Sequence, residues 1–271
     1  MKFQAGCRLS LWNIVIIGLV SACTSPAQKF DNTATALNLK KEIVEGNNFQ
    51  HVVYRRQGIL NPFLHVYLDG DGVLGYEGRV ARDPTPRNPL MLKLISLDDG
   101  PAVYVGRPCY HGMFMTSGCS SKLWTASRYS DEVISSTAKA IRNIAGEGKY
   151  ECVSLFGYSG GGTVARLVAE RLPCVHALIT IAANLDINRW ANYHGYARFS
   201  DSIDPILRPP LDPKIIQRHF VGGQDKVVPP SVAQNGITDL TNAFVLIDGY
   251  DHVCCWDNLW PSILKTVGVS N

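Results

Sequence analysis

Apolar runs and amphipathic stretches alternate along most of the chain, and their spacing predicts strands and helices in alternation. Several of the apolar runs are nearly continuous and rich in β-branched residues, which is typical of strands buried on both faces. The predicted strands span 49–54, 63–68, 102–105, 153–156, 175–182, 215–221 and 243–247. The predicted helices span 90–97, 130–145, 163–172, 231–240 and 258–267. This order predicts an α/β fold, in which a mainly parallel, doubly wound sheet has helices on both faces.

The first 22 residues have the layout of a secretory signal peptide. Lys2 and Arg8 precede an apolar stretch over 9–20, and small residues lead up to Cys23. The sequence VSAC at 20–23 resembles the lipobox of bacterial lipoproteins. That resemblance implies cleavage before Cys23 and acylation of its thiol, with palmitate among the attached chains. The alternative is an ordinary signal peptide that happens to contain a cysteine.

The predicted organisation is a signal peptide over 1–22, a lipidated Cys23 with a polar tether over 23–40, and one domain over 41–271. Residues 24–35 are polar, so we expect no fixed structure there. An acylated Cys23 would make the membrane a partner of the protein. Thr24 is not the aspartate that the resemblance to enterobacterial lipoproteins associates with inner-membrane retention. For a Gram-negative cell we therefore expect the outer membrane, with the domain facing the periplasm.

Composition limits the classes of partner. The chain has 271 residues, of which 46% are apolar, and 26 Lys and Arg residues against 23 Asp and Glu residues give a formal net charge of +3. The apolar share is that of a globular protein with a sizeable core. The near balance of charge argues against nucleic acid as a partner.

Six cysteines lie between the predicted lipidation site and the end of the chain. An even number outside the cytoplasm suggests disulfides. No C-x-x-C pattern occurs, and the adjacent Cys254 and Cys255 suit neither a zinc ribbon nor a zinc finger, so we expect no metal. The pairing of Cys254 and Cys255 stays open. The expected pairs are Cys109–Cys119, whose separation is short and glycine-rich, and, less strongly, Cys152–Cys174.

A nucleophile is expected at Ser159. The sequence GYSGG at 157–161 matches G-x-S-x-G, follows an apolar strand and opens a helix. The glycines permit a sharp turn that exposes the hydroxyl near a helix N-terminus, where negative charge is favoured. The alternatives are a glycine-rich turn with a surface serine and a phosphate-binding loop, for which the spacing is wrong and no lysine follows.

The base and the acid should follow the nucleophile in the order Ser, Asp, His. His252 comes directly after the last predicted strand, and His111 is the rival base. Asp225 stands in the turn after the sixth strand, where it could orient the imidazole and stabilise its charged form. The other candidate acids are Asp186 and Asp251.

The oxyanion hole needs two N–H donors. We assign them to Gly160, directly after the nucleophile, and to Asp71 in the sequence DGDG at 69–72. We expect the Asp69 and Asp71 side chains to turn away and to hold the loop by hydrogen bonds. The rival reading of DGDG is a calcium loop, but it lacks the closing Glu of an EF-hand. Arg107, which also follows a strand, could bind an anionic group or form a salt bridge.

These motifs together resemble the α/β-hydrolase superfamily, and the chain resembles a narrower group of bacterial α/β-hydrolase lipoproteins of unassigned activity. The matching stretches are YLDGDG (67–72), PTPRNP (84–89), GRPCY (106–110), GYSGGG (157–162), AANLD (182–186), GGQDKVVP (222–229) and GYDHVCCW (249–256). The resemblance implies a triad of Ser159, Asp225 and His252. The superfamily often has His-Gly where this chain has Asp69-Gly70. The segment 183–214 is too short for a large lid.

The predicted function is that of a serine hydrolase that uses an acyl-enzyme and no cofactor. Its expected substrate is a small-molecule or lipid-like carboxylic ester. A peptidase or amidase is the enzyme alternative. A non-catalytic envelope lipoprotein that binds a ligand or partner is the alternative outside enzymes.

Overall fold

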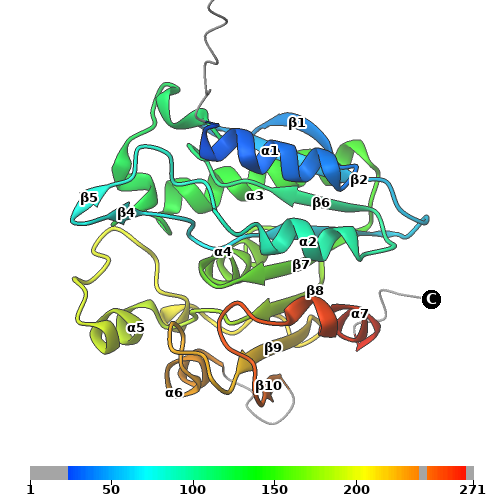
Figure 1. Ribbon diagram of the computed structural model, residues 1–271. Helices are drawn as coiled ribbons and strands as arrows, with labels where there is room; N and C mark the ends of the chain where they lie inside the picture. The colour runs from blue at the N-terminus through cyan, green and yellow to red at the C-terminus, as the bar shows by residue number, and fades with distance from the viewer. Residues whose placement is uncertain (1–23, 238–242, 267–271) are drawn as a thin grey trace, which may run out of the picture.

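A mixed, mostly parallel sheet forms the centre of the protein in a computed structural model, which describes residues 24–237 and 243–266 (Figure 1). The strand order is β1-β2-β6-β3-β7-β8-β9-β10. Strands β1 and β2 pair antiparallel, as do β2 and β6, and every pair from β6 through to β10 is parallel. The predicted α/β class is therefore confirmed.

The strands of this sheet are β1 (Lys40–Glu45), β2 (Gln50–Arg56), β3 (Phe63–Leu68), β6 (Ala102–Val105), β7 (Cys152–Tyr158), β8 (Val175–Ile181), β9 (Ile216–Gly222) and β10 (Phe244–Ile247). A small hairpin consists of β4 (Gly75–Tyr76) and β5 (Arg79–Val80). The α-helices are α1 (Pro26–Ala36), α2 (Leu90–Ser96), α3 (Asp131–Glu147), α4 (Gly160–Ala169), α5 (Ile187–His194), α6 (Pro230–Ala233) and α7 (Trp256–Thr266). Short 3-10 helices are η1 (Met113–Met115), η2 (Ser121–Trp124), η3 (Pro205–Leu207) and η4 (Gln234–Gly236).

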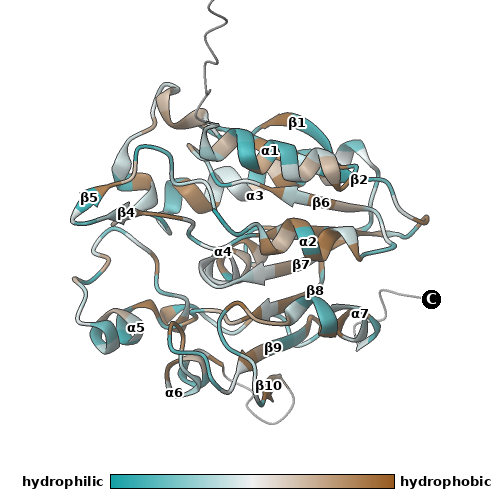
Figure 2. Ribbon diagram, in the orientation of Figure 1, coloured by the Kyte–Doolittle hydropathy of each residue, from teal (hydrophilic) through white to brown (hydrophobic). Residues whose placement is uncertain are grey.

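Two apolar layers enclose the sheet. On one face the buried side chains of α1, α2 and α7 pack on alternate residues of the central strands, such as Tyr67 and Phe156. On the other face α3 and α4 pack on their neighbours, such as Val66 and Leu155. This alternation follows from the pleat of each strand. Figure 2 shows brown residues along the strands and teal residues along α1 and α5.

The N-terminal segment departs from the expectation. We expected residues 24–35 to lack fixed structure, and this is wrong, because α1 occupies most of that stretch. Ser25 caps the helix by accepting a hydrogen bond from the Gln28 N–H, and a proline follows at its first position. Phe30 and Ala34 are buried in the core. The small apolar face of α1 was hidden in a sequence that is polar at most other positions.

Other differences concern edges and ends. Strand β1 was not predicted, because its residues are mostly charged and exposed, as is common at the edge of a sheet. The helix expected over 231–240 is the short α6 followed by η4, and 238–242 lie outside the described residues. Between β8 and β9 the chain forms only α5 and η3 with their loops, so the expectation of little or no lid is confirmed.

Three disulfides are present in the part of the chain that the structure describes. Cys109 pairs with Cys119 in the loop after β6, and Cys152 pairs with Cys174, which joins the starts of β7 and β8. The adjacent Cys254 and Cys255 form the third, just before α7. Cys23 and the predicted signal peptide lie outside the described residues. Among the helices that are described, none combines the length and the apolarity needed to cross a bilayer.

Candidate active site

Ser159 stands in the sharp turn from β7 into α4. Its φ of +53° and ψ of −126° are a strained combination for a residue other than glycine. Its N–H donates to the Ile181 carbonyl at 2.9 Å, which ties the turn to β8. A Cβ on Gly157 would lie 2.5 Å from the Gly162 Cα, so the turn closes only with glycine there. The strain and these contacts hold the Ser159 side chain in a partly exposed position.

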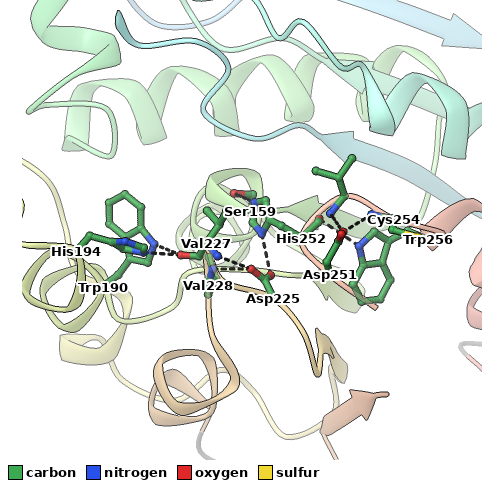
Figure 3. A network of polar contacts seen from close by, with 11 residues as sticks. Ser159, Trp190, His194, Asp225, Val227, Val228, Asp251, His252, Cys254 and Trp256 are labelled. Atoms are coloured by element: carbon green, nitrogen blue, oxygen red, sulfur yellow. Dashed lines mark hydrogen bonds and ion pairs between the residues drawn. The ribbon is translucent and has the colours of Figure 1, made fainter. Parts of the chain in front are cut away.

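His252 lies between Ser159 and Asp225 (Figure 3). Its Nε2 is 3.1 Å from the Ser159 Oγ, and its Nδ1 is 2.8 Å from the Asp225 Oδ2. The Asp225 carboxylate can only accept, so we assign the proton to Nδ1. Nε2 is then free to accept the hydroxyl proton of Ser159. The three side chains come from turns after three different strands, β7, β9 and β10.

The carboxylate of Asp225 is held on both sides. Its Oδ2 faces His252, while its Oδ1 accepts hydrogen bonds from the Val227 and Val228 N–H groups at 2.8 Å each. Helix α5 braces the same turn, because the Trp190 Nε1–H donates to the Val227 carbonyl at 2.6 Å and the His194 Nε2 lies 2.8 Å from it. Figure 3 shows this chain of contacts running from α5 to Ser159.

The rival acids have other contacts. The Asp186 Oδ1 accepts from the Arg189 N–H at 2.9 Å and caps α5. The Asp251 Oδ1 accepts from the Val253 and Cys254 N–H groups at 2.8 and 2.6 Å. Among the three acids, the hydrogen-bond partner of the His252 ring is Asp225.

The rival base, His111, is buried elsewhere. Its ring lies 4.5 Å from the Phe30 ring, and its Nε2 is 3.2 Å from the Tyr104 hydroxyl. Burial lowers the pKa of His111 to about 3. A neutral imidazole packed against α1 does not face Ser159, so the structure brings only His252 to the nucleophile.

The loop after β3 passes beside the elbow. A Cβ on Gly70 would lie 3.3 Å from the Ser159 Cβ, and a Cβ on Gly160 would lie 2.1 Å from the Asp71 Oδ1. The Gly70 N–H donates to the Asp69 Oδ1 at 2.9 Å. The Gly160 amide begins α4, where main-chain N–H groups have no partner within the helix. The structure thus brings Gly160 and Asp71 to Ser159, and their assignment as oxyanion donors stays a prediction.

The Asp71 side chain does not turn away from the elbow as expected. Its carboxylate lies against Gly160 and forms ion pairs with Arg107, 2.7 Å away, and Arg128, 3.2 Å away. The Tyr129 hydroxyl donates to it at 2.7 Å. Burial alone would raise the pKa of Asp71, but Arg128 and Arg107 outweigh burial and hold that pKa below its usual range. One carboxylate between two guanidinium groups leaves a net positive charge beside the nucleophile.

The Asp69 carboxyl is buried next to the same loop. Burial raises its pKa to about 7, against the opposing effects of the Gly70 N–H and of Arg107. Near neutral pH a large fraction of this carboxyl is therefore uncharged. The two acidic residues that follow β3 thus add little net negative charge where an oxyanion would form.

Two residues that the sequence did not point to, Arg128 and Tyr129, complete the site. Arg128 and Tyr129 precede α3 without any motif, and Trp190 and His194 lie on a helix that was not predicted. Arg107 was noted as an anion ligand or a salt-bridge partner, and the structure gives it the salt bridge. Within 24–237 and 243–266, no group of three or more His, Cys, Asp and Glu side chains is placed to hold a metal ion.

Comparisons with known proteins show which solved structures share this fold. No protein-family model matches the chain, and a search of curated proteins finds no similar sequence. Solved structures do match. A membrane phospholipase A, described as a bacterial virulence factor, has a TM-score of 0.53 and 16% identity, over 90% of this chain and 92% of that chain. A lidless α/β serine hydrolase from Xanthomonas campestris has a TM-score of 0.53 and 13% identity, over 84% and 94%.

An α/β hydrolase from the metagenome of lagoon sediments of Mar Chica, Morocco, has a TM-score of 0.51 and 18% identity, over 85% of this chain and 95% of that chain. At such identities the matches establish the architecture, and the chemistry has to be argued from the side chains. The chain therefore has the fold of the α/β hydrolases, and its structural neighbours include serine hydrolases and a phospholipase.

Proposed function

We propose that the protein is a serine hydrolase that cleaves carboxylic esters through an acyl-enzyme, with Ser159 as nucleophile, His252 as base and Asp225 as the orienting acid. The observation that carries this proposal is the unbroken run of contacts from the Asp225 Oδ2 through the imidazole to the Ser159 Oγ. A serine hydroxyl becomes nucleophilic only with such a base, and the base needs a third group to fix its tautomer.

In the proposed reaction the Ser159 Oγ attacks the ester carbonyl carbon while His252 takes the hydroxyl proton on Nε2. The tetrahedral oxyanion is stabilised by the Gly160 and Asp71 main-chain N–H groups. Collapse breaks the bond to the alcohol oxygen, which leaves with the proton from His252. Water then attacks the acyl-enzyme, again giving its proton to His252, and the acid product leaves with Ser159 restored.

The cluster around Asp71 supports the oxyanion part of this proposal. Arg107 and Arg128 neutralise the carboxylate that lies against Gly160. Without them, a buried negative charge would oppose the oxyanion at short range. With them, the charge beside the reacting carbonyl is positive, which favours the transition state.

The absence of a large insertion between β8 and β9 favours substrates that reach an open site. The structural neighbours include a membrane phospholipase A and a lidless serine hydrolase, and both descriptions are consistent with ester substrates. We accordingly propose small or lipid-like esters, with amides as the second class to be tried.

A fluorophosphonate probe tests the proposal, because it labels only an activated serine. We expect labelling of the wild-type protein and of Ser231→Ala, a control at an exposed serine, but none of Ser159→Ala. Unlabelled wild-type protein would contradict the triad. Hydrolysis rates for acyl esters of increasing chain length, and for matched amides, then show which chain length and which type of bond the protein prefers.

We also propose that Cys23 is acylated and that the domain is attached to the outer membrane, facing the periplasm. Support comes from the sequence alone, from the lipobox-like VSAC at 20–23 and from Thr24. Metabolic labelling with a palmitate analogue tests it: the wild-type chain should incorporate the label, and Cys23→Ala should not. An unlabelled protein in the soluble periplasmic fraction would contradict it.

A further inference from the structure

The start of α1 leaves very little chain between the proposed anchor and the folded domain. Only Thr24 and Ser25 separate Cys23 from Pro26, the first residue of the helix. An extended chain advances at most about 3.6 Å per residue. Helix α1 is itself fixed to the domain, because Phe30 and Ala34 are buried in the core. An acyl group on Cys23 would therefore hold the surface around Ser25 close to the bilayer.

That surface contains a groove. A groove of about 610 Å³ lies between Ser25 and Pro26 on one side and the β4–β5 hairpin on the other. Phe114, from the loop after β6, also lines it. The N-terminal end of α1 is tied to the same loop, because the Ala27 Cβ would lie 3.5 Å from a Cβ on Gly112. Three segments far apart in the sequence thus form one surface.

The side chains around the groove are apolar and basic. Tyr76 and Val80 line the groove and are 76% and 54% exposed, and Met115, which follows Phe114 in η1, is 74% exposed. Arg79 and Arg82 are exposed as well, and neither forms an ion pair within the described residues. We call the following six residues the docking surface: Tyr76, Arg79, Val80, Arg82, Phe114 and Met115.

The arginines that line the groove, Arg79, Arg82 and Arg87, outnumber its acidic residues, Glu77 and Asp83. Asp83 is buried, and its Oδ1 accepts from the Thr85 N–H and hydroxyl, while Glu77 is exposed in the hairpin turn. The Arg82 guanidinium lies 5.3 Å from the centre of the Phe114 ring. Figure 2 shows brown and teal residues side by side in this hairpin. Exposed aromatic and aliphatic side chains among arginines are the composition of surfaces that bind anionic lipid.

We infer that the docking surface binds an anionic phospholipid bilayer, with the apolar side chains entering the headgroup region and the arginines pairing with lipid phosphates. The inference rests on the proposed anchor at Cys23, which brings this surface to the membrane, but it does not depend on ester hydrolysis.

Docking would also orient the active site. The hairpin follows β3 and Phe114 follows β6, so the docking surface lies at the carboxyl edge of the sheet. Ser159 follows β7 at the same edge, and Figure 1 shows the hairpin on the side toward which β7 and β8 point. A domain docked in this way would present Ser159 toward the bilayer surface, where lipid-like esters are found.

Quenching by lipid tests the inference on the full chain, purified from membranes and reconstituted into vesicles of phosphatidylethanolamine and phosphatidylglycerol. Tyr76→Trp places a fluorophore on the docking surface, and Leu60→Trp is the control, since Leu60 is 100% exposed in the loop before β3, at the opposite edge of the sheet. Vesicles with bromine-labelled acyl chains should quench the added fluorescence of Tyr76→Trp and not that of Leu60→Trp.

The charge requirement is tested in the Tyr76→Trp chain. The pair Arg79→Gln and Arg82→Gln should lower the docked fraction, with each arginine contributing about fivefold to the ratio of docked to undocked protein. Lys149→Gln with Lys214→Gln is the matched control, because both lysines are exposed at the amino ends of β7 and β9. Vesicles of phosphatidylcholine alone, which carry no net negative charge, should lower the docked fraction of the Tyr76→Trp chain in the same way.

The outcomes separate the two proposals. Palmitate labelling of the same preparations reports the anchor, and quenching reports docking. A labelled chain whose Tyr76→Trp variant is not quenched, because the surface faces water or another protein, would overturn docking alone. Equal quenching of Tyr76→Trp and Leu60→Trp would overturn it too. An unlabelled, unquenched chain would overturn both. Neither readout depends on Ser159, so Ser159→Ala should dock normally.

Discussion

The two halves of the candidate site are built in different ways. On the acid–base side, Asp225 and His252 stand in short turns directly after β9 and β10, and neighbouring main-chain N–H groups hold the Asp225 carboxylate. On the oxyanion side, Asp71 is held by Arg107, Arg128 and Tyr129, which come from two other segments of the chain. The Asp225 carboxylate is thus held by N–H groups two and three residues along the chain, whereas the Asp71 carboxylate depends on buried charges that meet only in the fold.

Removing the acid–base side should abolish catalysis while leaving the fold intact. Ser159→Ala and His252→Ala should each lower kcat by roughly 10⁶, and Asp225→Asn by about 10⁴, because the acid orients the proton acceptor and does not take the proton itself. Steady-state kinetics on the ester found by screening give kcat, and circular dichroism with thermal unfolding checks the fold.

Asp186→Asn is the matched control for the acid. Its carboxylate caps α5 and does not contact His252, so this variant should keep most of its kcat. If Asp186→Asn lowered kcat strongly and Asp225→Asn lowered it only slightly, the acid would be misassigned. The acid–base side would then not be built from the turn that holds Asp225.

On the oxyanion side, Arg107→Met should reduce stability. The Arg107 side chain is 5% exposed, and its loss leaves the buried Asp71 with one cation fewer. Breaking a buried ion pair from one side typically costs about 3–5 kcal/mol. Urea unfolding measures this cost. The activity lost with it should be in kcat more than in KM, because Asp71 lies against Gly160.

Lys40→Met supplies the surface comparison. Lys40 is 79% exposed and pairs with Glu42 at 3.0 Å, and such pairs contribute at most about 1 kcal/mol. If Arg107→Met were as mild as Lys40→Met, the Asp71 cluster would not stabilise the fold, and the contrast between the two halves would lose its energetic basis.

The same contrast explains what the sequence could predict. Ser159, Asp225 and His252 each follow a predicted strand in a known order, so position along the chain carried the information. No motif or strand end identifies Arg128 and Tyr129 in the sequence. Both contact the Asp71 carboxylate, which lies more than fifty residues earlier in the chain. Long-range ion pairs leave no periodicity or motif in the sequence.

The prediction that residues 24–35 lack fixed structure failed for a related reason, because they form most of α1. Its sequence, PAQKFDNTATA, is polar at most positions, and only Ala27, Phe30 and Ala34 are buried. The cap at Ser25 and the following proline are start signals that were outweighed by the expectation of a tether. Packing against the domain, which the sequence does not reveal, decides that this segment is helical.

The Cys109–Cys119 disulfide should stabilise the oxyanion side by a smaller amount. It closes a loop with a sequence separation of 10 just beyond Arg107, and loops of this size give about 2–3 kcal/mol. Cys109→Ser with Cys119→Ser should lower the free energy of unfolding by that much. The pair Cys152→Ser and Cys174→Ser, far from Asp71 at the other edge of the sheet, should destabilise without changing kcat. Equal kcat in both double variants would show that the loop needs no covalent support.

The smallest expected effect is a pH dependence that belongs to the oxyanion side alone. Burial raises the pKa of Asp69 in the folded protein to about 7, above its ordinary value in an unfolded chain. The folded state therefore binds this proton more tightly than the unfolded state does. The stability that the protonated carboxyl contributes is fully present below about pH 4, falls as the pH rises through 7, and is absent above that. Asp69→Asn keeps an oxygen for the Gly70 N–H and removes the ionisation, so its free energy of unfolding should lack this component. Relative to Asp69→Asn, the wild-type protein should thus lose on the order of 1–2 kcal/mol between pH 6 and pH 8. Urea unfolding of both proteins across that range measures the difference. A difference that does not vary with pH would mean that Asp69 ionises normally, and the loop after β3 would then place two negative charges, not one, beside Ser159.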